Sequence, residues 1–119
     1  MFDCSSIPCT EITKLAAHDA EGPEDVFSGE LFGYRVALSG SQVLVGDPYE
    51  NTGGGSKAGA AYLFDCSSLP CSRTRLTASD SAAGDKFGAS VALSSDLALV
   101  CAPYADANGR DSGAAYLFQ

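Results

Sequence analysis

Four cysteines in two equally spaced pairs are the residues of this chain best suited to do chemistry. Cys4 and Cys9, and again Cys66 and Cys71, enclose four residues in the matching stretches CSSIPC and CSSLPC. Zinc would need further Cys or His ligands, and the thiol redox motif encloses two residues instead of four. A turn of this length brings two Cα atoms within disulfide reach. The spacing therefore predicts two local disulfides and an oxidising compartment.

The other reactive side chains give no sign of catalysis. Cys101 ends an apolar run, and we interpret it as a buried thiol, with an intermolecular bridge as the alternative. His18 is the single histidine, and no nucleophile-elbow motif accompanies it. The sequence also contains no phosphate-binding loop and no paired-carboxylate motif that stands out from turn aspartates. These observations favour a protein that is not an enzyme.

Charge and hydropathy argue against nucleic acid and membranes as partners of this protein. The formal net charge of −8 argues against a basic surface for nucleic acid or anionic lipid. No apolar run approaches the roughly 18 residues of a membrane span, so we expect no membrane insertion. The N-terminal stretch MFDCSSIPCTEITK lacks the pattern of a signal peptide. With the paired cysteines, this predicts an extracellular or cell-surface protein whose targeting segment has been removed.

Self-similarity dominates the rest of the chain. Two copies of one unit, each of roughly 55 to 62 residues, follow one another. The matching stretches are FGYRVALSG (32–40) with FGASVALSS (87–95), GDPY (46–49) with CAPY (101–104), and GAAYLF at both 59–64 and 113–118. A repeat of this length is one supersecondary unit, so the fold follows from what a single unit forms.

Each unit contains four short runs typical of β-strands. Val36 and Leu38 alternate with small or polar neighbours in the first run, and the dense runs QVLVG and LALVC predict second strands buried on both faces. The stretches SGS and SSD between the first and second runs predict tight turns. AAYLF is a third strand, and TRLTA, like EITKL near the N-terminus, predicts a solvent-facing outer strand. No apolar period of 3.6 residues is sustained. We expect an all-β fold of two four-stranded antiparallel, propeller-type blades.

Each unit also carries Phe-Gly before its first strand and a Pro after its second. The residues are Phe32-Gly33 and Phe87-Gly88, then Gly46-Asp47-Pro48 and the more degenerate Cys101-Ala102-Pro103. Phe supplies a buried anchor, and Gly allows a close backbone approach. These motifs resemble FG-GAP repeats, the blades of integrin-α-type propellers and of many secreted proteins. The resemblance implies a β-propeller with a role in extracellular interactions.

The resemblance also implies where calcium would bind, because many FG-GAP repeats carry a D-x-D-x-D-G-x-x-D loop between the second and third strands. Aligning Gly109 with the turn glycine places Asp106, Asn108 and Ser112 at ligand positions, with Tyr104 at the first. That is half of a site, and Asp, Asn and Gly also form turns without a metal. We therefore expect no cofactor, with calcium at Asp106, Asn108 and Ser112 as the alternative.

The phase of the repeat predicts an assembly. It divides the chain into an outer strand of a preceding blade (1–19), a first blade (20–80) and a second blade without an outer strand (81–119). We expect the N-terminal strand of one protomer to complete the second blade of the next, head to tail, in a ring or a filament. The contact is predicted to involve Ile12, Lys14 and Leu15 of the donor and Tyr116 and Phe118 of the acceptor.

The sequence thus predicts an extracellular, non-enzymatic building block for self-assembly or adhesion, whose main partner is itself. Two alternatives stay open: a module that binds a glycan or another extracellular protein, assisted by calcium, and an excerpt of a longer propeller. Loops 50–58 and 105–112 are rich in glycine and almost without aromatic residues, which makes them poor material for a sugar platform.

Overall fold

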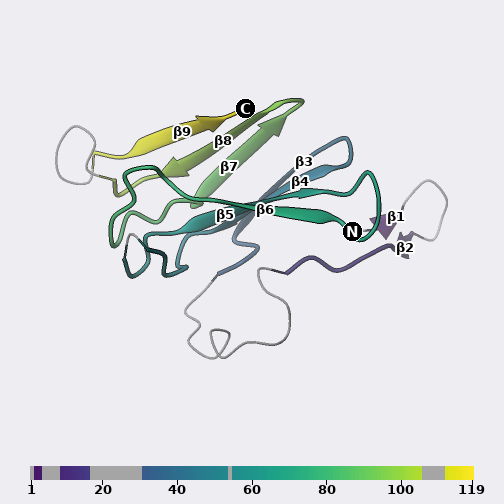
Figure 1. Ribbon diagram of the computed structural model, residues 1–119, viewed down its shortest axis with the longest axis horizontal. Helices are drawn as coiled ribbons and strands as arrows, with labels where there is room; N and C mark the ends of the chain where they lie inside the picture. Colours follow the sequence, from purple (N-terminus) through teal and green to yellow (C-terminus); the bar gives the residue numbers. More distant parts are fainter. Residues whose placement is uncertain (1, 4–8, 17–30, 54, 106–111) are drawn as a thin grey trace.

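The chain folds into β-strands joined by turns. The computed structural model describes residues 2–3, 9–16, 31–53, 55–105 and 112–119 (Figure 1). The strands are β1 (Phe2–Asp3), β2 (Thr10–Glu11), β3 (Arg35–Ser39), β4 (Gln42–Asp47), β5 (Ala60–Asp65), β6 (Ser72–Leu76), β7 (Ser90–Ser94), β8 (Leu97–Ala102) and β9 (Ala114–Phe118). No helix occurs within these residues, and the all-β prediction is confirmed.

The strands form one antiparallel sheet per repeat, β3-β4-β5-β6 and β7-β8-β9. A two-residue turn joins the first two strands of each sheet: Gly40-Ser41 between β3 and β4, and Ser95-Asp96 between β7 and β8. The first turn residue has a positive φ in each case, 59° at Gly40 and 46° at Ser95. That conformation matches the twist of a tight hairpin, which glycine adopts readily and serine at some cost. The predicted turns are therefore present in both repeats.

The second sheet has three strands, and β9 is one of its two edge strands. Its predicted completion by a strand from a neighbouring protomer is not shown by the structure of one chain. Within residues 9–16 of the predicted outer strand, Thr10–Glu11 forms β2, which pairs with β1 in the register that β6 has with β5. The first blade is thus complete and the second is three-stranded.

The main core lies between the two sheets and takes residues from both. Leu44 and Ala61 of the first sheet meet Ala98 and Val100 of the second, and all four are buried. Phe87 is fully buried in the same cluster, as expected for the anchor of the Phe-Gly motif. The two repeats therefore form one folded unit by burying apolar surface against each other.

Two glycines set how closely the sheets approach. A Cβ at Gly46 would lie 2.0 Å from the carbonyl oxygen of Gly88, and one at Gly88 would lie 2.4 Å from that of Ala60. Gly88 also has a φ of 98°, which other residues rarely adopt. Any side chain at either position would push the sheets apart, which explains the glycine of the second Phe-Gly motif, Gly88.

Strand β8 departs from the prediction. Val100 is fully buried, but Leu97 and Leu99 on the same strand are 41% and 38% exposed. The prediction that LALVC is buried on both faces is wrong for the single chain, because no described residue covers the outward face of the second sheet. Cys101, predicted to be a buried thiol, is free and partly buried.

A disulfide joins Cys66, at the end of β5, to Cys71, just before β6. This predicted pair is confirmed, and both cysteines pack against a second apolar cluster that contains Phe64. Closing so short a loop contributes about 2 kcal/mol on the chain-entropy model. Cys9 is also disulfide-bonded, and its predicted partner, Cys4, lies outside the described residues.

Candidate functional site

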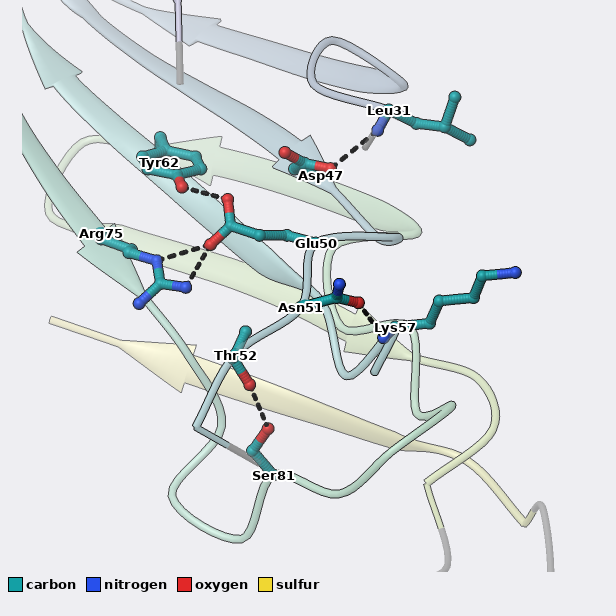
Figure 2. A network of polar contacts seen from close by, with 9 residues as sticks. All are labelled: Leu31, Asp47, Glu50, Asn51, Thr52, Lys57, Tyr62, Arg75 and Ser81. Carbon is teal, nitrogen blue, oxygen red and sulfur yellow. Dashed lines mark hydrogen bonds and ion pairs between the residues drawn. The ribbon is translucent and has the colours of Figure 1, made fainter. Parts of the chain in front are cut away.

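A buried polar network lies where the β4–β5 loop meets the first sheet (Figure 2). Glu50 is 1% exposed, and its carboxylate accepts hydrogen bonds from the Tyr62 hydroxyl and from the Arg75 guanidinium, whose Nε lies 2.7 Å from Oε2. Farther along the loop, Asn51 Oδ1 accepts a hydrogen bond from the Lys57 amide at 3.0 Å. The network thus ties the loop to β5 and β6.

This network positions the loop and is unsuited to acid–base catalysis. Burial raises the pKa of the Tyr62 phenol, and the Glu50 carboxylate raises it further, so Tyr62 remains a neutral donor. Glu50 is shielded from solvent and already bound by two donor side chains, so it cannot serve as a general base. Asp47, also buried, accepts a hydrogen bond from the Leu31 amide at 2.9 Å and fixes the start of the first repeat.

Tyr116 is the repeat equivalent of Tyr62 but uses a different partner. Ala105 stands where the first repeat has Glu50, and Tyr116 donates instead to Asp80 Oδ1 at 2.6 Å. Burial and then this hydrogen bond raise the pKa of Tyr116 to about 12. The residue links β9 to the connection between the two sheets.

Alkaline pH should therefore weaken the fold through Tyr116. The phenol ionises near pH 10 in an unfolded chain and near pH 12 in the folded one, so its stabilising contribution is complete below about pH 10 and is lost between about pH 10 and 12. Tyr116→Phe cannot ionise and should reduce the slope of stability against pH in that window. Thermal unfolding of both proteins across the window measures it; an unchanged slope would contradict this role.

Both outward sheet faces carry exposed apolar side chains. On the first sheet, Val36 and Leu38 are 64% and 67% exposed. They border a hollow of about 510 Å³ that Phe32, Val43 and Val45 also line. We call this surface the front face.

The outward face of the second sheet is also apolar, and we call it the back face. Leu97 and Leu99 project from β8 and Leu117 from β9, and Leu117 is 64% exposed. Side chains of this size that share one sheet face are typical of a surface that another protein covers.

The repeat relates the front face to a buried surface. Val91 and Leu93 of β7 pack in the core against the first sheet. Their equivalents in the first repeat are Val36 and Leu38, the exposed residues of the front face. The front face thus has the same design as the surface by which the second sheet binds the first.

The back face is likewise equivalent to a buried surface, the one by which the first sheet packs against the second. Leu44 and Leu63 of the first sheet lie in the core and contact the second sheet. Their equivalents are Leu99 and Leu117, which are exposed on the back face. The two outward faces are therefore copies of two surfaces that already bind each other inside the chain.

Comparison with protein families identifies the repeat. The family model described as FG-GAP repeat matches residues 9–64 and again residues 72–118. The chain belongs to the FG-GAP repeat family. FG-GAP repeats form β-propeller modules that are generally non-enzymatic and typical of extracellular or surface proteins. No curated protein matches the chain.

The N-terminal segment lies on the front face of the first FG-GAP repeat. Leu15 packs against a cluster that includes Val45, Tyr62 and Phe64. Its repeat equivalent, Leu76 in β6, packs in the core between the sheets. Leu15 therefore occupies the place that the outer strand of a preceding FG-GAP blade would take.

The five residues predicted for assembly are not brought together within one chain. Ile12 and Lys14 are exposed on the segment that leads to Leu15. Tyr116 and Phe118 lie on β9 at the edge of the other sheet, with ring centroids 5.5 and 6.0 Å from that of Phe87. Their side chains fill the core, while the backbone of β9 remains an edge. The predicted contact between donor and acceptor stays a prediction about two chains.

The structure leaves the calcium prediction untested. Asp106 and Asn108 lie outside the described residues, as does His18, and Ser112 is exposed. Among the residues that the structure describes, no group of three or more His, Cys, Asp or Glu could hold a metal ion. Those residues also include no helix long and apolar enough to cross a membrane.

A groove between the two repeats was not predicted from the sequence. Seven residues line this hollow of about 210 Å³, which we call the tyrosine groove: Tyr34, Pro48, Tyr49, Lys86, Ala89, Pro103 and Tyr104. Tyr49 and Tyr104 stand just before loops 50–58 and 105–112, which are themselves poor in aromatic residues. The Pro-Tyr pair that occurs once in each FG-GAP repeat is the signal that could have revealed it.

Proposed function

We propose that this FG-GAP protein is an extracellular, non-enzymatic building block that assembles head to tail with copies of itself in a structural or adhesive role. The observation that carries the proposal is the relation between the outward faces. The front and back faces are exposed copies of two surfaces that bind each other inside the chain. Surfaces related in this way give a heterologous contact, which continues into a ring or a filament.

In the proposed contact, the back face of one protomer covers the front face of the next. Leu99 and Leu117 of the first protomer take the positions that Leu44 and Leu63 have in the core. Leu15 of the second protomer already lies on its own front face, at the position of Leu76. The contact therefore joins three strands of one chain and the N-terminal segment of the other into a single four-stranded blade.

The internal repeat also gives the register of this blade. In the first sheet, Ala61 pairs with Leu76 and Leu63 with Thr74. Ala115 and Leu117 are the repeat equivalents of Ala61 and Leu63, and Leu15 is the equivalent of Leu76. The same register between two chains therefore pairs Ala115 with Leu15, Leu117 with Thr13 and Phe118 with Ile12. All five residues predicted for assembly fall in this ladder.

One sequence difference between the repeats makes the proposed contact between two chains differ from the contact between the two sheets of one chain. Cys101 occupies the position of Gly46, where any Cβ would strike the neighbouring backbone at 2.0 Å. The intermolecular contact must therefore be more open at that end of the strands. The angle between successive protomers then differs from the angle between the two sheets of one protomer.

Cysteine cross-linking tests the register. Thr13→Cys and Leu117→Cys are made as separate proteins, each with Cys101→Ala, then mixed and oxidised. We expect disulfide-linked pairs that contain one chain of each, because paired positions in a sheet lie about 5 Å apart. Leu69→Cys, in an exposed turn, replaces Leu117→Cys in the control mixture. Equal yields from the two mixtures would contradict the register.

The disulfides and the family support an extracellular location, where the assembly could contact other extracellular proteins or glycans. Calcium at Asp106, Asn108 and Ser112 is the alternative to a protein without a cofactor. If the outward faces bind further blades of one longer propeller, the protein will not associate with itself.

A further inference from the structure

We propose that the tyrosine groove is a binding site for an anionic polysaccharide. Lys57 and Lys86 would hold its carboxylate or sulfate groups, and the tyrosine rings would pack against its sugar rings. The groove lies within one chain, at the strand ends where the two repeats meet, so this proposal does not depend on self-assembly.

Two lysines converge on the rings of the groove. Lys86 Nζ lies 4.6 Å from the ring centroid of Tyr104 and 5.2 Å from that of Tyr49, and Lys57 Nζ lies 5.0 Å from that of Tyr49. The two ammonium groups are thus at most about 10 Å apart, a separation at which salt screens their repulsion only in part. An anion bound between them would relieve it.

The backbone holds these lysines in an unusual conformation. Lys57 and Lys86 have φ values of 55° and 59°, and the amide of Lys86 donates a hydrogen bond to the carbonyl of Lys57 at 3.1 Å. Such a conformation costs residues other than glycine about 1 kcal/mol or more, and it is frequent at ligand sites. The hydrogen bond between the two backbones holds these lysines, one from each repeat, next to each other.

Charge at the groove is opposite to that of the whole chain. The protein has a net charge of −8 and seven basic residues, of which Lys57 and Lys86 stand here and Arg35 lies 4.5 Å over the ring of Tyr34. Neither lysine forms an ion pair within the described residues. The carboxylates of Glu50 and Asp85, which neighbour Tyr49 and Lys86 in the chain, are buried, whereas Lys57 is exposed and Lys86 is partly exposed.

The shape favours a sugar chain over a peptide. Tyr34 and Tyr104 are nearly half exposed, and their flat rings can accept the apolar C–H face of a pyranose. The volume of about 210 Å³ is below the roughly 300–1,000 Å³ of pockets that enclose a small molecule, so it suits one ring of an extended chain. The groove crosses strand ends and offers no strand edge for a peptide to extend.

Calorimetric titration of the full chain tests the proposal. The probes are a six-residue oligogalacturonate, a sulfated dextran of similar length, the methyl-esterified oligogalacturonate and hexaglutamate. We expect at least one anionic sugar to bind in a salt-dependent way, while the neutral ester and hexaglutamate bind at least tenfold more weakly.

Variants locate the site. Lys57→Gln and Lys86→Gln should each weaken binding about tenfold, because each removes a charge-assisted contact. Arg73→Gln, which removes one positive charge from β6, should change it less than about twofold. Tyr104→Phe keeps the ring and should preserve binding, whereas Tyr104→Leu should weaken it. Circular dichroism confirms that each variant is folded.

Four results would overturn the proposal: binding of neither anionic sugar, equal binding of the neutral ester, equal or tighter binding of hexaglutamate, or unchanged affinity in both lysine variants. Tight hexaglutamate binding would assign the groove to acidic peptides instead.

Discussion

Leu38→Asp and Leu117→Asp are each expected to reduce the assembly to folded single chains of 12.2 kDa. Both side chains are about two-thirds exposed in one chain, so the fold should tolerate the change. In the proposed contact each aspartate would be buried without a partner, which costs several kcal/mol. Light scattering measures the mass, and circular dichroism confirms the fold.

A mixture of the two variants should form a dimer and nothing larger. Leu38→Asp keeps an intact back face and Leu117→Asp an intact front face, so one good contact remains and neither end can extend. Leu69→Asp, which changes an exposed leucine of the disulfide turn, should leave assembly intact. The head-to-tail contact is wrong if both variants alone assemble like the unaltered protein, or if their mixture contains only single chains.

Glu50→Ala should destabilise the fold more than any of the surface substitutions above. It leaves the buried Tyr62 hydroxyl without its acceptor and the partly exposed Arg75 without its counter-ion. Together we expect a loss of about 3 kcal/mol and a fall in melting temperature of about 10–15 °C. Thermal unfolding followed by circular dichroism gives both values.

Two further variants separate charge from packing at this site. Glu50→Gln retains an acceptor for Tyr62 but not the charge for Arg75, and should fall between the unaltered protein and Glu50→Ala. Glu11→Ala removes an exposed carboxylate from β2 and should change stability little. If Glu50→Ala unfolds at the same temperature as Glu11→Ala, the buried network contributes little to the fold.

Local features of this fold could be predicted from the sequence. The alternation at Val36 and Leu38, the repeated AAYLF run and the two-residue turns at Gly40 and Ser95 depend on neighbours in the chain, and all form the expected strands and hairpins. The Cys66–Cys71 pair was predictable for the same reason, because a short turn alone brings the cysteines together.

Features that depend on tertiary packing could not be predicted in the same way. Leu99 has the sequence pattern of a core residue, yet it is exposed because its burial requires a partner on the back face. Pairing of β2 with β1 repeats the register of β6 with β5, but the sequence period does not show which chain supplies the other strands of that blade. The tyrosine groove joins Tyr34, Tyr49 and Tyr104, which only the packing of the two sheets brings together.

The mass of the unaltered protein in solution, measured by light scattering, tests head-to-tail assembly most directly. We predict particles of at least three protomers, with a mass that is a multiple of 12.2 kDa for a ring or a broad distribution for a filament. A folded protein that remains a single 12.2 kDa chain at all accessible concentrations would contradict head-to-tail assembly.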